Sequence, residues 1–185
     1  MTAGAVLCGG DSRRMGTDKA FVEVAGVAMA ERVARALAAS GCDPVAFVGG
    51  DAALLARFQR ATIADRWPGR GPVGAIITAL GAFDDDVLIA ACDLPFVDAA
   101  SAGTLIAAAT ADQGSPRVDV FVAAADRPQP LLAWWRHECR PAVERAWAVS
   151  DGATGVRDII AQLRSQPVAV AAAALRNVNR PDDLG

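Results

Sequence analysis

A short loop near the amino terminus has the clearest chemical potential in the sequence. Gly9 and Gly10 follow an apolar run directly, and Arg13, Arg14 and Lys19 come next in the same segment. Glycines lack a Cβ, so their backbone N–H groups can approach an anion closely while neighbouring cations neutralise its charge. The spacing is neither that of a Walker loop nor G-x-G-x-x-G. The loop therefore indicates a triphosphate site of another kind, with a solvated surface loop as the alternative for this segment taken alone.

Two aspartates supply the complementary chemistry. Asp93 follows the apolar run 87–92, and Asp65 lies in a loop rich in glycine and arginine. A carboxylate at the end of a buried strand can hold Mg²⁺, which keeps most of its waters and takes its other ligands from phosphate oxygens. Each aspartate alone would also suit a turn or a helix cap. The prediction of a metal-assisted phosphate site therefore depends on their combination with the first loop.

Alternating short apolar runs and longer amphipathic runs would position these residues. The apolar runs predict strands over 3–8, 44–48, 61–64, 87–92, 118–124, 131–135 and 167–171. The amphipathic runs predict helices over 28–39, 52–58, 72–80, 99–111, 136–149 with an interruption at Pro141, and 156–163. This order predicts an α/β fold with a mostly parallel sheet and helices on both faces. Ligands in such sheets lie at the carboxyl ends of the strands, so we expect loop 9–19, Asp65 and Asp93 to share one crevice.

Length and composition set the outer limits. A chain of 185 residues fits a single domain over 1–185. The formal net charge of −3 provides no basic footprint for nucleic acid. The cysteines form no C-x-x-C pair, which argues against a zinc site or a disulfide framework. With no signal peptide and no long apolar run, we expect a cytoplasmic protein that binds no membrane.

Three other conspicuous groups are expected to be structural. Trp134 and Trp135 stand where a strand meets a helix, a place typical of core residues. His137 is expected at the surface. The acidic run 84–86 precedes its strand, so it lies at the wrong end of the sheet and is expected to form a solvated turn.

Four segments in order resemble the molybdenum cofactor guanylyltransferases, a family of nucleotidyltransferases. They are 7–20 (LCGGDSRRMGTDKA), Asp65 with 71–76 (GPVGAI), 92–95 (CDLP) and 177–184 (NVNRPDDL). The resemblance spans nearly the whole chain. It implies a Rossmann-like three-layer αβα fold, GTP and Mg²⁺ as cosubstrates, and transfer of GMP from GTP to the terminal phosphate of molybdopterin with release of pyrophosphate.

The same resemblance implies residue roles. The nucleotide site would comprise Leu7, Cys8, Gly9, Gly10, Lys19, Asp65 and Asp93. The catalytic residues would be Lys19, Arg14 and Asp93, with Asp93 as the metal ligand. Asn177 and Asn179 would bind the molybdopterin acceptor, although turn chemistry explains them equally well. Two departures concern the base and ribose: Cys8 replaces the usual alanine, and 73–75 reads Val-Gly-Ala where the family has Leu-Ala-Gly.

Other functions stay open at this point. A relative that uses CTP or another phosphorylated acceptor is the nearest alternative, although Gly9 after Cys8 and Asp18 before Lys19 favour guanylyl transfer. A nucleotide-binding module without catalytic activity is the alternative from another class. Cofactor-delivery proteins and recipient molybdoenzymes are further expected partners.

Overall fold

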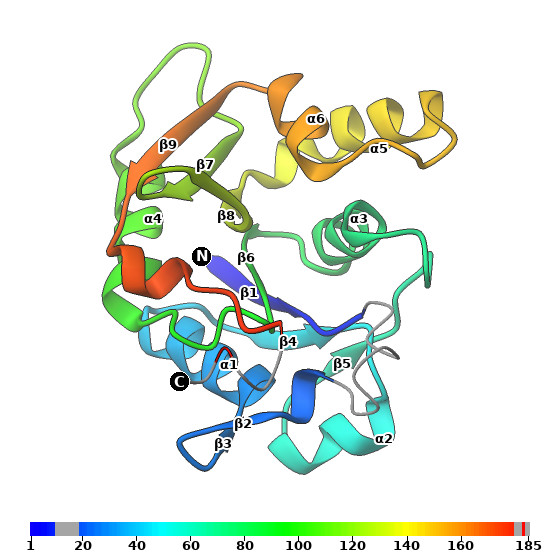
Figure 1. Ribbon diagram of the computed structural model, residues 1–185. Coiled ribbons are helices and arrows are strands. Elements are labelled where there is room, and N and C mark those ends of the chain that lie inside the picture. Colours follow the sequence, from blue (N-terminus) through cyan, green and yellow to red (C-terminus); the bar gives the residue numbers. More distant parts are fainter. Residues whose placement is uncertain (10–18, 180–182, 184–185) are drawn as a thin grey trace.

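One mixed sheet organises the molecule (Figure 1). The computed structural model describes residues 1–9, 19–179 and 183. The sheet has seven strands, in the spatial order β5 (Thr62–Ile63), β4 (Val45–Val48), β1 (Thr2–Leu7), β6 (Asp86–Ala91), β8 (Pro128–Trp135), β7 (Val120–Ala124) and β9 (Ser165–Ala169). Strand β8 is antiparallel to β6 and β7, and the other neighbours pair in parallel. The mostly parallel α/β fold is therefore confirmed.

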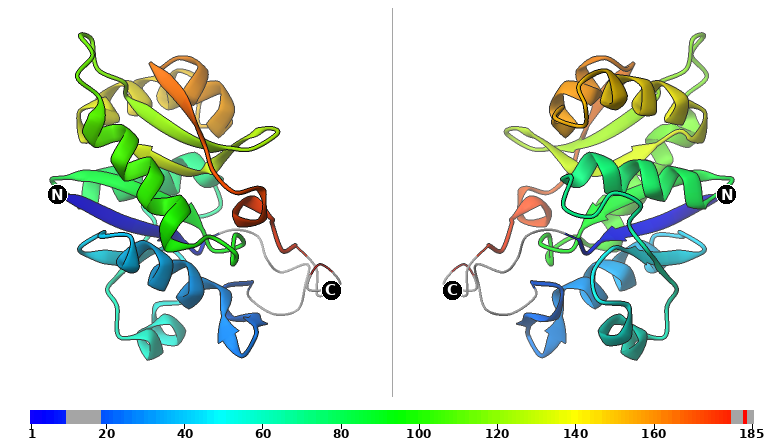
Figure 2. Two further views of the ribbon diagram at one scale, coloured as in Figure 1. Left: turned by 90° about the vertical axis from the view of Figure 1, so that its left-hand side faces the viewer. Right: turned by 90° about the vertical axis from the view of Figure 1, so that its right-hand side faces the viewer.

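Helices cover both faces of the sheet (Figure 2). On one face α1 (Met29–Ala39) and α4 (Ala99–Ala111) pack into one apolar core. On the other face α3 (Pro72–Ala82), α5 (Arg140–Val149) and α6 (Val156–Ala161) pack into a second core. Central strands β1 and β6 are buried along almost their whole length, as expected for strands with helices on both sides.

Short elements complete the chain. The helix expected over 52–58 is α2 (Ala52–Leu55) followed by the 3₁₀ helix η3 (Ala56–Phe58), and the Asp51 side chain caps the amino terminus of α2. Other 3₁₀ helices are η2 (Lys19–Phe21), η4 (His137–Cys139) and η5 (Ala172–Leu175). Within the described ranges, no helix has the length and apolarity to span a membrane.

Two expectations about local structure were wrong. A small hairpin of β2 (Glu23–Val24) and β3 (Val27–Ala28) was not predicted, and it turns through Ala25 and Gly26, which both have positive φ. The helix expected over 136–149 begins instead at Arg140, with Pro141 in its first turn rather than as an interruption. Proline is favoured there because the first helical N–H groups have no partner within the helix.

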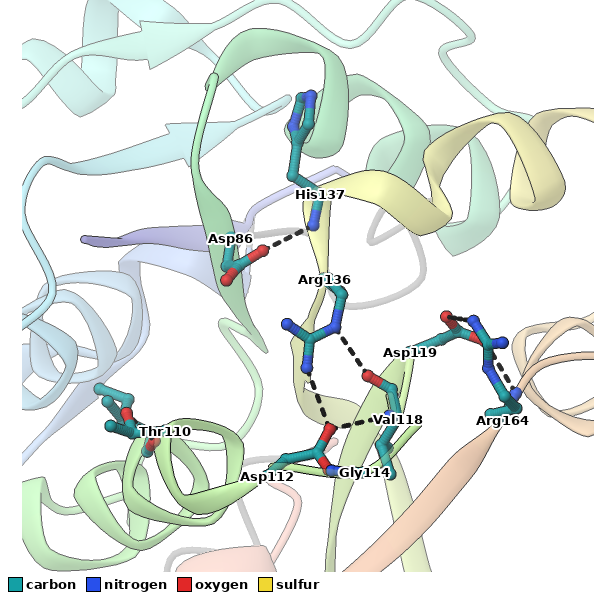
Figure 3. Close-up of polar contacts among 10 residues, drawn as sticks. Asp86, Thr110, Asp112, Gly114, Val118, Asp119, Arg136, His137 and Arg164 are labelled. Carbon is teal, nitrogen blue, oxygen red and sulfur yellow. Dashed lines mark hydrogen bonds and ion pairs between the residues drawn. The ribbon is translucent and has the colours of Figure 1, made fainter. Parts of the chain in front are cut away.

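Polar contacts connect strand ends and loops at the end of the sheet away from the predicted crevice (Figure 3). Arg136, only 6% exposed, donates to the Val118 carbonyl at 2.9 Å and to Asp112 at 3.2 Å. The backbone N–H of His137 donates to Asp86 at 2.8 Å. His137 is half-buried, so only part of its side chain lies at the expected surface. Trp134 and Trp135 are buried in the core, as predicted.

Candidate active site

A cavity opens at the carboxyl ends of the parallel strands β1 and β6. It has a volume of about 430 Å³. Its lining includes six residues that were predicted to bind the nucleotide: Leu7, Cys8, Gly9, Lys19, Asp65 and Asp93. The structure therefore brings these predicted residues together. Gly10 and Arg14, which were also predicted, lie outside the described residues, as does Arg13.

Glycines allow two backbone segments to meet beside this cavity. The Cys8 N–H donates to Val48 O at 2.9 Å, which brings Gly9 beside Gly49. A Cβ on Gly49 would lie 3.1 Å from both the Cα and the nitrogen of Gly9, and Gly49 has a φ of +71°. Only glycine fits this position without strain. No function was predicted for Gly49 and Gly50, although a glycine pair after a parallel strand was an available signal.

Asp65 follows β5 and is held with one oxygen bonded and the other directed at the first loop. Its Oδ1 accepts the Trp67 N–H at 3.0 Å and lies 3.2 Å from the hydroxyl of Thr78, which is buried in α3. Its Oδ2 lies 3.8 Å from the position that a Cβ on Gly9 would occupy. Helix α3 therefore fixes the carboxylate so that Oδ2 remains on the cavity side.

Packing explains the two departures from the family pattern. A Cβ on Gly74 would lie 3.1 Å from Cβ of Trp67, so glycine at this position admits the Trp67 side chain. Ala75 then places its methyl group in the cavity lining. Cys8 also lines the cavity, and a Cβ on Gly50 would lie 3.1 Å from Cys8 Cβ, so this corner accepts only small side chains.

The carboxy-terminal asparagines lie against Lys19 and Asp93. Lys19 Nζ donates to Asn179 Oδ1 at 2.7 Å and lies 3.9 Å from Asp93 Oδ2. The Asp93 carbonyl accepts the Val178 N–H at 2.9 Å. The Asn177 side chain lies near the Asp93 carboxylate and acts to lower its pKa. Residues predicted for phosphate, metal and acceptor binding therefore form one connected group.

The surroundings of Asp93 disfavour the ionised form of its carboxyl group. Burial raises the pKa of the Asp93 carboxyl, and this effect outweighs the opposing influences of the Lys19 charge and the Asn177 side chain. Its Oδ1 is buried, and no described group donates a hydrogen bond to it. A divalent cation would compensate such a carboxylate, so Asp93 fits the role of metal ligand. No described cluster of three His, Cys, Asp or Glu side chains could hold a metal by itself.

Strand β8 adds residues that sequence reasoning missed. Leu131 lines the cavity. Gln129 donates from Nε2 to Asn177 Oδ1 at 2.8 Å. No local pattern marks either residue, because their positions depend on how β8 pairs beside β6.

Comparisons with known proteins agree with this geometry. The family model described as "MobA-like NTP transferase domain" matches residues 4–168. The chain is 32% identical to the molybdenum cofactor guanylyltransferase of Mesorhizobium japonicum over 98% of this chain and 92% of that protein. It is 31% identical to a relative from Opitutus terrae, named "Probable molybdenum cofactor guanylyltransferase", over 98% of this chain and 92% of that protein.

A solved structure provides a third comparison. The crystal structure of molybdopterin-guanine dinucleotide biosynthesis protein A from Archaeoglobus fulgidus superposes with a TM-score of 0.77 and 26% identity, over 100% of this chain and 95% of that one. Sequence and structure thus agree along nearly the entire chain. The protein belongs to the family of MobA-like NTP transferase domains.

Proposed function

We propose that this protein transfers GMP from GTP to the terminal phosphate of molybdopterin and releases pyrophosphate. The observation that carries the proposal is the contact of Lys19 with both Asp93 and Asn179 beside the cavity. Groups suited to phosphate, metal and acceptor thereby meet at one point. The names of the relatives from Mesorhizobium and Opitutus support guanylyl transfer.

The cavity would hold the nucleoside part of GTP. Leu7, Cys8 and Gly9 offer a narrow surface with exposed backbone beside it, and Asp65 Oδ2 offers an acceptor for an N–H or hydroxyl group. A volume of about 430 Å³ is within the range of small-ligand sites. Gly10 and Arg14 are proposed to bind the phosphates.

The chemistry requires positioning and charge stabilisation more than proton transfer. An oxygen of the acceptor phosphate forms the new bond to the α-phosphorus of GTP, and the bond to the bridging oxygen breaks with its electron pair leaving on pyrophosphate. A phosphate monoester is largely ionised at neutral pH, so no general base is needed. Lys19 can exchange its Asn179 and Asp93 contacts for phosphate oxygens, and its charge then stabilises the departing pyrophosphate.

Asp93 would hold the divalent cation, which we propose to be Mg²⁺. When bound, the ion would neutralise negative charge on the phosphates and help to orient them. Asn177 and Asn179 are proposed to bind the acceptor, beside Lys19 and Asp93.

Pyrophosphate release tests this function directly. Purified protein with GTP, Mg²⁺ and molybdopterin should release pyrophosphate and form a guanylylated pterin detectable by mass spectrometry. Omission of the pterin or chelation of the metal should abolish release. Turnover with CTP but not GTP would assign the chain to cytidylyl transfer, and nucleotide binding without turnover would indicate a non-catalytic module.

A further inference from the structure

Two cysteines lie opposite each other where the central strands β1 and β6 end. The register of these parallel strands pairs Leu7 with Ala91. The Cys92 N–H donates to the Leu7 carbonyl at 3.0 Å, which continues the parallel ladder by one residue. Cys8 and Cys92 are therefore the next pair in the register, and both are thiols.

Both side chains lie on the same face of the sheet and border the nucleotide cavity. Paired residues of neighbouring strands share a face, and Cys8 and Cys92 both belong to the apolar core beneath α1 and α4. They are only 5% and 9% exposed, yet both line the cavity. The other two cysteines, Cys42 and Cys139, are buried and do not line it. The cavity therefore gives a small reagent a route to this one pair of thiols.

The spacing of the pair permits a disulfide bond after a small movement of the strand ends. Neighbouring strands lie about 4.8 Å apart, and the Cα atoms of a disulfide lie about 4.4–6.8 Å apart. Side chains stand roughly perpendicular to a sheet, so the two Cβ atoms begin at about the strand spacing. A disulfide brings them to about 3.8 Å, so the strand ends must approach by about 1 Å. Gly9 and Asp93 directly follow the two cysteines, so this movement would displace residues of the site.

We propose that Cys8 and Cys92 form a redox-active pair, which hydrogen peroxide oxidises reversibly to a disulfide that deforms the nucleotide cavity. Cys8 stands where the guanylyltransferase pattern usually has alanine, so this departure from the pattern is what creates the pair. The oxidation itself depends only on the two thiols and their access from the cavity. The effect on nucleotide binding rests on the proposed function.

The oxidation proceeds in two steps. The sulfur of one cysteine attacks an oxygen of hydrogen peroxide, the O–O bond breaks, and a sulfenic acid and one water are formed. The sulfur of the second cysteine then attacks the sulfenic sulfur, and the S–S bond forms as hydroxide leaves. The hydroxide takes the proton of the second thiol and becomes a second water. Two electrons thereby pass from the pair of thiols to the peroxide, and a dithiol reductant reverses the change by thiol–disulfide exchange.

Peptide mapping of the full chain after treatment with hydrogen peroxide provides the first measurement. Trypsin releases Cys8 in peptide 1–13 and Cys92 in peptide 71–117, so the disulfide joins these two peptides into one species in mass spectrometry. Dithiothreitol should separate them. Cys8→Ala and Cys92→Ala should each abolish the joined species, whereas Cys42→Ala, the matched control at a buried cysteine outside the cavity, should keep it. Absence of the joined species in wild type, or its presence in Cys92→Ala, would overturn the proposal.

Calorimetric titration with GTP and Mg²⁺ provides the second measurement, in which each protein is compared with itself before and after peroxide. Wild type and Cys42→Ala should lose affinity by about tenfold or more and regain it with dithiothreitol. Cys92→Ala should stay within about threefold of its own untreated value, and Cys8→Ala takes its place if that variant does not fold. Because linkage is reciprocal, saturating GTP should also reduce the amount of disulfide formed in wild type.

The two measurements fail separately. An unchanged GTP affinity in wild type that carries the disulfide, or an equal loss of affinity in Cys92→Ala, would overturn the effect on the cavity. If reduced wild type does not bind GTP, the proposed function fails, yet the peptide map still decides whether Cys8 and Cys92 are a redox-active pair.

Discussion

Lys19 is the only lysine in the sequence, which otherwise uses arginine for its permanently charged basic side chains. Its ammonium lies 2.7 Å from Asn179 Oδ1 and 3.9 Å from Asp93 Oδ2. A compact ammonium can follow phosphate oxygens as they move, whereas the planar fork of arginine prefers a fixed bidentate geometry. The use of lysine at this one place therefore agrees with a role at a departing pyrophosphate.

Replacement of Lys19 should damage catalysis. We expect Lys19→Ala to lower kcat/KM by about 100-fold or more, in the range known for loss of one charge-stabilising group. Lys19→Arg should recover only part of the activity. Steady-state kinetics with GTP and molybdopterin varied separately measures this, and a wild-type rate for Lys19→Ala would refute the role given to the first loop.

The single lysine also permits a direct spectroscopic check of the same contact. Reductive methylation with ¹³C-formaldehyde keeps the positive charge and labels only Lys19 and the amino terminus. The Lys19 signal should shift when GTP is added. The Met1 amine contacts Asp85, at the other end of the sheet, and its signal should stay in place as an internal control.

Asp93 should limit the stability of the metal-free protein. Because burial raises its pKa, the folded state prefers the protonated carboxyl, and ionisation of Asp93 costs stability until the pH has passed the raised pKa. Stability from this group therefore falls as the pH rises above the unfolded value of about 4. With a chelator present, Asp93→Asn should raise the melting temperature near pH 7 while abolishing turnover.

The acid limit provides the control for Asp93→Asn. At about pH 3, both folded and unfolded states of wild type carry a protonated Asp93, so the two proteins should melt alike apart from the effect of the substitution itself. If Asp93→Asn were less stable relative to wild type at neutral pH than at acid pH, the electrostatic account of Asp93 would be contradicted.

At the scale of elements, two loops must pass very close to each other where β1 and β4 end. Gly9 and Gly49 form this contact, and only Gly9 was predicted from the sequence to belong to the nucleotide site. The strands and helices around them were predictable because long buried runs carry a clear apolar pattern. The β2–β3 hairpin was not, because strands of two residues carry no period, and Pro141 was misjudged because proline suits a first turn as well as an interruption.

Gly49→Ala should weaken nucleotide binding through this contact. A Cβ there would approach Gly9 to 3.1 Å, so Gly9 must shift. Gly26→Ala is a matched control, because Gly26 has a similar φ of +76° with nothing within 4 Å of the added Cβ. Both substitutions should cost about 1 kcal/mol of stability from positive φ, measured by denaturant unfolding.

Calorimetry with GTP and Mg²⁺ then separates the two alanine variants. Only Gly49→Ala should lose affinity, by about tenfold. Equal affinities for both variants would show that the Gly9–Gly49 contact has no part in the nucleotide site.

At the scale of the whole molecule, the sheet brings together residues that are remote in the chain. Lys19 and Asn179, which bond directly, are separated by 160 positions. The alternation of strands and helices predicted that Asp65, Asp93 and the first loop would converge, because parallel strands share one carboxyl edge. It could not predict Gln129 or the contact between Lys19 and Asn179, because these depend on an antiparallel strand and on the return of the carboxy-terminal segment to the site.

The central claim is that this edge of the sheet forms a GTP site, and binding of the four nucleoside triphosphates tests it most directly. Isothermal titration of the wild-type protein with GTP, ATP, CTP and UTP, each with Mg²⁺, should give the tightest binding for GTP. The Gly49→Ala and Lys19→Ala variants should weaken that binding. Tighter binding of CTP than GTP, or GTP binding that neither substitution affects, would contradict the account.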